Sequence, residues 1–311
     1  MDEIDFMISM HLMVDSRAPY RELADCFNMS VNSIHKRVKS MVDLGVIQNF
    51  NTRLSFINFP NIVNVIAFGI SKTKDPKATI ENLGTHECIY NVTQASSNLF
   101  YIHSYIQNLN QLDSLVTFIR NKGEIDQFTV GLEKQELPIN RENLVDISLS
   151  KLDYLIINAL KDNSRKTISD IADEAGVSTK TIRRHLDRIM EKKLAEFTID
   201  WYPDKTPEIL SFIILKVNPG AIVNEEKVME ELRKQYGQKV LFSWTFSNLP
   251  DLILICVWIR IMKELQEIES FLRTKQFKSV DITVLVEGKN FPTWRDTFLE
   301  EKIKEIKQIN P

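Results

Sequence analysis

A repeat inside the chain limits what it can fold into more than any other feature of the sequence. Asp5 and Asp153 lie at an offset of 153 − 5 = 148 residues, and this offset then holds without a gap. The residues matched at this offset include Ile8 with Ile156, Leu12 with Leu160, Ser16-Arg17 with Ser164-Arg165, Ala24-Asp25 with Ala172-Asp173, Ser30 with Ser178 and Ile34 with Ile182. An amphipathic pattern could align two unrelated helix bundles, but it would not match the caps, the turn and the small residue together. We therefore interpret the repeat as an internal duplication, which bears on the whole fold.

The second copy contains a helix with two contrasting faces. Ser178 is a good N-cap, so this helix is predicted to begin at Thr179. Its apolar face, which should be buried, carries Ile182, Leu186, Ile189 and Met190. Its other face carries the cations Lys180, Arg183, Arg184 and Arg188. Residues 168–175 predict a short preceding helix, and Gly176 can take the positive φ that a tight turn between helices requires. The pattern is typical of a DNA-reading helix-turn-helix, with an ordinary surface helix as the alternative.

The first copy has the same order of helices with fewer cations. Helices are predicted around Asp5, over residues 20–27 and over residues 31–44. Asn28 tolerates a left-handed conformation, so it can serve as Gly176 does in the second copy. Residues 46–54 then look like two short strands that form a wing, matched by residues 194–201.

After each helical part, the sequence alternates between strand and helix patterns in the order βαββαβ. The predicted strands are rich in Val, Ile and Phe, as a half-buried sheet requires. In the first half they cover residues 62–70, 89–93, 99–106 and 125–132, with helices at 77–83 and 109–120. In the second half they cover residues 210–217, 240–245, 252–258 and 280–286, with helices at 225–236 and 262–272. This order predicts an α+β fold with two ferredoxin-like sandwiches.

Proline-rich and polar joints divide the chain into six segments. We expect winged helix-turn-helix domains at 1–56 and 148–203, ferredoxin-like domains at 57–136 and 204–289, a linker at 137–147 and an amphipathic helix within 290–311. That last helix carries Trp294, Phe298, Ile303 and Ile306 and has no equivalent in the first half. Packing against its own chain or against a second copy is its expected role.

The composition is that of a globular protein, and it narrows the classes of function. The chain has 311 residues, no apolar run long enough to span a bilayer and no signal-peptide character at its start, so we expect a cytoplasmic protein. Cys26, Cys88 and Cys256 are far apart, which predicts buried or inert thiols and neither a disulfide framework nor a metal site. We expect no cofactor. The formal net charge of −3 means that any DNA contact must come from local cationic patches.

The order of helix-turn-helix, wing and βαββαβ module resembles the leucine-responsive/asparagine-regulator (Lrp/AsnC) family of prokaryotic transcription factors. The residues that carry this resemblance are Leu152-Asp153, Leu160, Arg165, Ile171-Ala172, Val177-Ser178 and the Arg-rich third helix, answered in the first half by Ile4-Asp5, Leu12, Arg17, Leu23-Ala24, Met29-Ser30, Arg37-Val38 and Gly45-Val46-Ile47. The resemblance implies a sequence-specific regulator that binds double-stranded DNA and is not an enzyme. Members of the family dimerise through their βαββαβ modules, so the tandem chain looks like a dimer written into one polypeptide, and a homo-oligomer of at least two chains is expected.

The third helix of each copy should supply the contacts to DNA. Base edges are read from the face opposite the core, near the start of that helix. The expected base readers are Lys180, Thr181, Arg184 and Arg188 in the second copy and Asn32, Ser33, Lys36 and Ser40 in the first. The expected phosphate contacts are Arg183, Lys192, Lys193, His35, Lys39 and Arg53. Because the two sets differ in charge, the preferred DNA site should be asymmetric.

The sequence departs from the family where an amino-acid effector usually binds. That site uses a glycine-containing turn and an aspartate between the second and third strands of the module. Here residues 96–99 and 247–251 occupy it, and Asp251 alone remains of the usual elements. An amino-acid effector is therefore not expected. Ser97, Asn98, Asn248 and Asp251 are the candidates for another small molecule, and the alternative is that the modules serve only to hold the dimer together.

Two other functional classes remain as alternatives, an enzyme and a protein that does not bind DNA. Siroheme decarboxylases are similar in architecture to the Lrp/AsnC family and can also be tandem, but their Arg-Arg-Ile-Gly-like wing is missing at residues 47–50 and 195–198. Tyr90-Asn91 and Phe100-Tyr101 are faint echoes of that enzyme, with His86 and His103 nearby and no nucleophile with a supporting partner. The other reading is a ligand-sensing or interaction protein that does not bind DNA.

Overall fold

The chain folds into two compact units, each built from both halves of the sequence. The computed structural model describes residues 1–59, 61–134, 148–218, 225–275 and 277–309. Unit 1 draws on Met1–Asn61, Leu137–Lys205 and Pro292–Pro311, and unit 2 on Ile62–Glu136 and Thr206–Phe291. The predicted linker at 137–147 lies outside the described residues. Like parts of the two halves therefore associate with each other in space.

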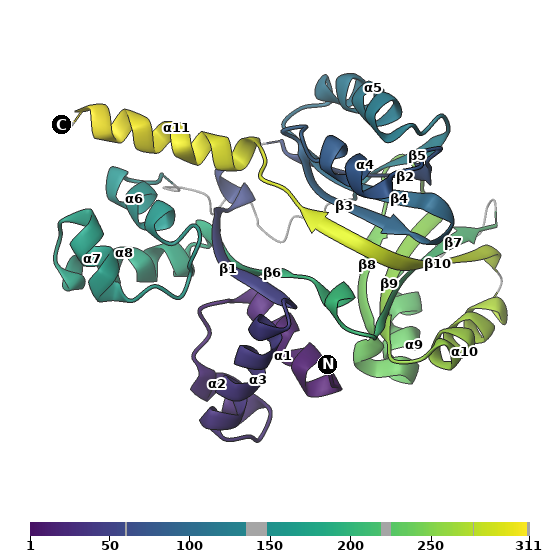
Figure 1. The fold of residues 1–311 in the computed structure, drawn as a ribbon, viewed down its shortest axis with the longest axis horizontal. Coiled ribbons are helices and arrows are strands. Elements are labelled where there is room, and N and C mark those ends of the chain that lie inside the picture. Colours follow the sequence, from purple (N-terminus) through teal and green to yellow (C-terminus); the bar gives the residue numbers. More distant parts are fainter. Residues whose placement is uncertain (60, 135–147, 219–224, 276, 310–311) are drawn as a thin grey trace. The chain divides into compact units, whose positions relative to one another are not determined.

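Unit 1 contains the two predicted groups of three helices (Figure 1). The first group is α1 (Glu3–Val14), α2 (Tyr20–Cys26) and α3 (Val31–Asp43), and the second is α6 (Lys151–Ala159), α7 (Ile168–Ala175) and α8 (Thr179–Glu191). The predicted caps are confirmed, because Ser30 Oγ accepts from Ser33 N and Ser178 Oγ from Thr181 N. Asn28 and Gly176 both take positive φ, at 51° and 65°, as the turns require.

The prediction of a two-stranded wing in each half is wrong. Each segment forms a single strand, β1 (Ile47–Leu54) or β6 (Ala195–Trp201), and the two pair antiparallel with each other. Each strand also packs against the helix group of the other half. Ile199 of β6 lies in the core of the first helix group, and Leu54 of β1 lies in the core of the second. The alternation of apolar residues at 195, 197, 199 and 201 was the signal for one strand with a buried face. No glycine or proline in either segment favours a turn within it.

The C-terminal helix α11 (Trp294–Ile309) packs against its own chain, in the second half of unit 1 (Figure 1). Leu299 and Ile303 are buried in the core that α6, α7 and α8 share. Lys161 Nζ lies 2.7 Å from Glu300 Oε1, which adds an ion pair at the same contact. Phe59 packs edge-on against the rings of Trp294 and Phe298.

Unit 2 contains two βαββαβ modules, as predicted. The first is β2 (Val63–Ile70), α4 (Pro76–Leu83), β3 (Ile89–Ala95), β4 (Leu99–Ile106), α5 (Gln111–Gly123) and β5 (Phe128–Leu132). The second is β7 (Ile209–Val217), α9 (Glu225–Tyr236), β8 (Val240–Thr245), β9 (Leu252–Ile259), α10 (Met262–Arg273) and β10 (Phe277–Asn290). Short 3-10 turns lie at Ser96–Asn98 and Gly237–Lys239 in this unit, and at Phe56–Asn58 and Pro203–Lys205 in unit 1.

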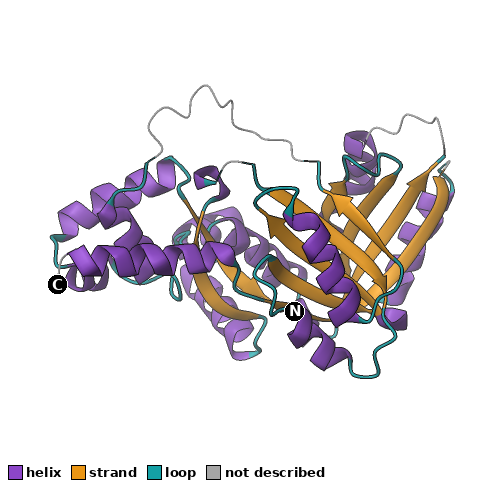
Figure 2. Cartoon of the chain, turned by 90° about the horizontal axis from the view of Figure 1, so that it is seen from above, coloured by secondary structure: helices purple, strands orange, loops and turns teal. Residues whose placement is uncertain are grey.

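The strands of the two modules lie together in one sheet (Figure 2). Their order in this sheet is β5-β2-β4-β3-β10-β7-β9-β8. The modules join through antiparallel pairing of β3 with β10, and Glu133 and Phe246 bridge β5 to β8. At this bridge Gly131 leaves room for the Phe246 ring, because a Cβ there would lie 2.2 Å from a ring atom. Tyr101, Phe212 and Leu254 belong to the apolar core that both modules share. The α+β fold class is confirmed.

Candidate nucleic-acid interface

Helix α8 presents a cationic face to solvent. Ile182, Leu186 and Ile189 are buried on its other side, as predicted, whereas Met190 is 38% exposed and does not join that core. Lys180, Arg183 and Arg184 are exposed. Thr181 is half-buried, with its hydroxyl 2.9 Å from Ser178 Oγ at the start of the helix. This face offers three cations within two turns, a density that suits phosphate and base contacts.

Helix α3 presents a more neutral face at the equivalent position. Asn32, His35, Lys36, Lys39 and Ser40 are exposed, and Ser33 is half-buried with its hydroxyl 2.9 Å from Ser30 Oγ. The His35 ring lies edge-on to Tyr20 at 5.7 Å. In each half the predicted contact residues near the start of the third helix thus lie on one helix face, and the two faces differ in charge.

Arg188 is placed apart from the exposed cations of α8. Its Nη1 donates to Asp153 Oδ2 at 2.6 Å and its Nη2 to the Ser148 carbonyl at 2.6 Å. The Asp153 side chain is 0% exposed and also lies 2.8 Å from His185 Nδ1. Burial alone would raise the pKa of Asp153, but hydrogen bonds from His185, Ser150 and Arg188 hold this pKa below its usual value.

The first half has a related contact made from a different position. Arg37 Nη1 donates to Asp5 at 2.7 Å and to Asp2 at 2.8 Å, so Asp5 holds α3 as Asp153 holds α8. Sequence reasoning missed this pair of anchors. Aspartates at the same offset in both first helices, with a cation on each third helix, were the available signal.

The remaining predicted phosphate contacts lie at the edges of these helices. Arg53 of β1 contacts Asp200 of β6 at 3.3 Å, so its guanidinium already has an anionic partner within unit 1. Lys192 and Lys193 are exposed where α8 ends, and Lys193 takes a positive φ of 51°.

The four residues predicted to bind an effector form turns and hydrogen bonds within unit 2. Asn98 Nδ2 donates to the carbonyls of Ser71 and Thr73 at 2.9 and 3.0 Å, and Ser97 takes a φ of 59° without being glycine. Asn248 bonds the edge of β5 through Leu132 N and the Val130 carbonyl, each at 2.8 Å. Asp251 accepts from Val217 N through its backbone carbonyl.

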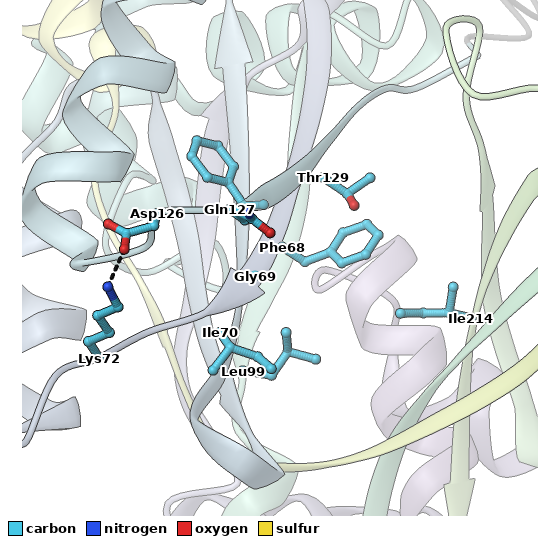
Figure 3. A pocket seen from close by; sticks show the side chains of 10 residues that line it. Phe68, Gly69, Ile70, Lys72, Leu99, Asp126, Gln127, Thr129 and Ile214 are labelled. Carbon is cyan, nitrogen blue, oxygen red and sulfur yellow. Dashed lines mark hydrogen bonds and ion pairs between the residues drawn. The ribbon is translucent and has the colours of Figure 1, made fainter.

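A pocket of about 640 Å³ opens on unit 2 beside one of these turns (Figure 3). It is lined by Phe68, Gly69, Ile70, Lys72, Leu99, Asp126, Gln127, Phe128, Thr129 and Ile214. Lys72 and Asp126 form an ion pair with each other. None of the four predicted effector residues is among those that line it, although Leu99 directly follows Asn98.

The histidines considered for enzyme chemistry pack against aromatic rings. His103 is buried near Tyr90, Phe212 and Trp244, and burial lowers its pKa to about 4, so it is neutral at physiological pH. His86 lies 4.7 Å from the Phe118 ring, and burial lowers its pKa as well.

The cysteines only partly follow the expectation. Cys88 and Cys256 are buried, and burial raises the pKa of Cys88 to about 11, whereas Cys26 is exposed. The described residues include no group of three or more His, Cys, Asp or Glu side chains that could hold a metal ion. Within the same ranges, none of the helices has the length and apolar character needed to cross a membrane.

Comparisons with known proteins identify the helical parts of unit 1. The family described as "Winged helix-turn-helix DNA-binding" matches residues 1–48 and 149–194. An uncharacterised HTH-type transcriptional regulator of Pyrococcus furiosus is 33% identical over 96 residues, which are 30% of this chain and 64% of that protein. The chain therefore spans less than two thirds of the length of this relative. The HTH-type transcriptional regulator Ptr1 of Methanocaldococcus jannaschii is 25% identical over 134 residues, 43% of this chain and 86% of Ptr1.

A solved structure shares the fold of the whole chain. The siroheme decarboxylase NirDL superposes with a TM-score of 0.57 at 10% sequence identity, covering 98% of this chain and 100% of that one. At this identity the likeness concerns the fold alone. The match to the family model, by contrast, covers α1 to α3 and α6 to α8. The family described as winged helix-turn-helix DNA-binding thus matches once in each half of the chain.

Proposed function

We propose that this chain is a sequence-specific transcriptional regulator of the Lrp/AsnC type that binds double-stranded DNA in the cytoplasm. The observation that carries the proposal is the exposed cationic face of α8, with Lys180, Arg183 and Arg184 opposite a buried apolar stripe, inside a domain that matches a DNA-binding family. A helix of this kind enters the major groove and reads base edges with its outer side chains.

The proposal includes a tandem duplication in which one chain does the work of a dimer. It is supported by the recurrence of one element order in both halves, by the pairing of the equivalent strands β1 and β6, and by the joining of the two βαββαβ modules into one sheet through β3 and β10. The chain then presents two unlike recognition helices, α3 and α8, to one DNA site.

A salt-dependent mobility-shift assay tests DNA binding most simply, with fragments from upstream of the chain's own gene. If about six phosphates are contacted, log affinity should fall with log salt concentration with a slope of about −5. Arg183→Ala, at an expected phosphate contact, should reduce the magnitude of that slope by about 1, while the control Lys263→Ala, an exposed cation of α10 in unit 2, should leave it unchanged. An affinity for DNA that does not change with salt concentration, or no binding at all, would contradict the proposal. That result would favour an interaction protein that does not bind DNA.

We further propose a small-molecule effector other than an amino acid, held by unit 2. The pocket supports this, because its volume of about 640 Å³ lies in the range of ligand sites and its wall combines apolar side chains such as Phe68 and Ile214 with polar ones such as Thr129. Thermal unfolding with a panel of small metabolites should reveal one class that raises the melting temperature. If free amino acids alone raise it, the effector class is wrong, and if nothing does, the modules are a scaffold.

Association of two chains through unit 2 completes the proposal. Among the described residues, the outer edge of β5 is joined near Glu133 and Phe246 to the end of β8, and the Val240 end of β8 lies farthest from this junction, so we expect a second chain to pair there. Sedimentation equilibrium should give a mass of twice 36.1 kDa or more. A 36.1 kDa species at every concentration would contradict this part alone.

A second candidate is an enzyme of the siroheme decarboxylase type, which the full-length likeness in fold to NirDL favours. His103 would be the candidate acid or base of such an enzyme, but burial among aromatic rings lowers its pKa to about 4, which makes it a weak base and leaves it unprotonated, and so unable to act as an acid, at physiological pH. Titrating the purified protein with siroheme while recording its absorbance spectrum decides between the candidates. A regulator leaves the spectrum unchanged, whereas a bound or decarboxylated siroheme shifts it.

A further inference from the structure

The two winged helix-turn-helix domains hold each other through the turns that follow their first helices. We call the residues Ser16, Arg17, Ser164 and Arg165 the seam. Ser16 Oγ and Ser164 Oγ lie 2.6 Å apart, and both residues are 0% exposed. Arg17 donates to the carbonyls of Ser164 and Lys166, and Arg165 donates to the Ala18 carbonyl at 2.9 Å. Each turn therefore bonds to its counterpart in the other half.

Each turn also bonds to the strand of the other half. Ser16 N donates to the Phe197 carbonyl of β6 at 3.0 Å, and Ser164 N donates to the Phe50 carbonyl of β1 at 2.7 Å. The Arg165 guanidinium lies over the Tyr20 ring at 4.3 Å and over the Phe50 ring at 5.2 Å. The seam thus braces the two-stranded ribbon of β1 and β6 from both sides.

The seam is not the only contact between the two domains, because β1 also pairs with β6. Burial lowers the pKa of Arg17 and of Arg165, and the nearby charge of Asp15 raises both only in part, so placing both cations here has a free-energy cost. Arginine offers several donors in a rigid plane, which fixes the geometry of the carbonyls that it bonds. A two-stranded ribbon on its own twists readily. The free-energy cost of burying the two arginines is therefore offset by the definite orientation that their hydrogen bonds give to the two domains.

We infer that the seam is a positioning element that holds α3 and α8 in one orientation and at one spacing, so that the chain reads two half-sites at a fixed separation. Residues of the seam stand directly before α2 and α7, which pack in the same cores as α3 and α8. A shift at the seam would therefore move each recognition helix with its domain. The role in reading DNA rests on the proposed function, whereas the rigidity does not.

Distances between spin labels test the rigidity without DNA. Asp43→Cys and Glu191→Cys place labels at the exposed, equivalent ends of α3 and α8, and Cys26→Ser removes the exposed thiol. In the full chain the label–label distance should have one narrow distribution. Arg17→Met with Arg165→Met should make it roughly twice as wide, because the ribbon alone then sets the angle. Arg233→Met, an exposed cation of α9, is the matched control and should leave the width unchanged.

A folding control and two further variants make the distance measurement interpretable. Helix content from circular dichroism must match the unsubstituted chain, and Ser16→Ala with Ser164→Ala gives a milder second variant. Arg17→Lys with Arg165→Lys keeps the charges but not the fork of donors, so it should remain broad. Equal widths in all well-folded variants would overturn the inference.

A spacer series then tests the consequence for DNA. Each base pair added between the half-sites rotates one of them by about 35° around the duplex, so the chain should lose roughly tenfold in affinity per added pair, and the seam variants less than roughly threefold. If no duplex binds, the proposed function fails while the distance measurement still stands. If the unsubstituted chain tolerates every spacer equally, the inference fails although DNA binding holds.

Discussion

At the scale of single residues, Asp153 is the group on which the position of α8 most depends. Its buried carboxylate accepts from Arg188 and Ser150 and lies against His185, so it joins the start of α6 to the second and third turns of α8. Arg188 was expected to read bases, a role that stays a prediction, but the structure gives its guanidinium a partner inside the domain. This contact could not be predicted from the sequence, because the pattern of α8 alone does not show which of its arginines faces α6.

Replacing the anchor should therefore destabilise the second domain. Asp153→Asn leaves the Arg188 and His185 side chains without their carboxylate and should lower the free energy of unfolding by about 3 kcal/mol. Urea denaturation followed by circular dichroism measures this. Asp187→Asn, an exposed acid on α8, is the control and should change it by less than about 0.5 kcal/mol.

The same carboxylate makes stability depend on pH. Its pKa is lower in the folded protein than in the unfolded chain, so its contribution is fully present above the unfolded value of about 3.9 and is lost as the pH falls through the folded pKa. The difference in unfolding free energy between the unsubstituted chain and Asp153→Asn should shrink below about pH 4. A difference that stays constant down to about pH 2 would exclude this linkage.

The exposed cations should differ in their value for DNA binding. Arg184→Ala should weaken binding to a preferred site by roughly tenfold or more, because an arginine can make two bonds to a guanine edge. Lys36→Ala, the equivalent change in α3, should cost roughly threefold. Fluorescence anisotropy with one labelled duplex compares them. Equal losses would mean that the two helices contribute alike.

At the scale of elements, local signals predicted most helices and strands. Ser30, Ser178 and Gly176 fixed where helices begin and end, because caps and positive φ depend on neighbouring residues. The wing failed for the opposite reason. Pairing of β1 with β6 joins residues from different halves, and the sequence of one segment does not name its partner. The four predicted effector residues likewise sit in real turns, but Phe68 and Ile214 of the neighbouring pocket come from strands that only the sheet brings together.

Helix α11 should stabilise one domain and not the other. Leu299→Ala opens a cavity in the core of α6 to α8 and should cost about 3 kcal/mol. Hydrogen exchange followed by peptide should show faster exchange in α6 to α8 and unchanged exchange in α1 to α3. The exposed residue Lys304 gives the control variant Lys304→Ala. Equal loss of protection in both helix groups would show that α11 supports the whole of unit 1.

At the scale of the whole molecule, the 148-residue offset between Ser16 and Ser164 reappears as a contact in the folded chain. Corresponding domains of the two halves meet in both units, through the equivalent strands β1 and β6 in one and through β3 and β10, which are not equivalent, in the other. The repeat was visible in the sequence because caps and core positions recur at one offset. Which strands would join the two halves was not, since the sequence of one strand does not name its partner.

Selection of binding sites from random duplexes tests most directly whether one chain reads DNA with two unlike helices. The exposed face of α8 carries three cations where that of α3 carries neutral polar groups and fewer cations, so the two half-sites should differ in sequence. The account predicts an asymmetric site with a fixed spacing, whose stronger half loses its preference in Arg184→Ala. Recovery of a perfect palindrome one helical turn wide would contradict it.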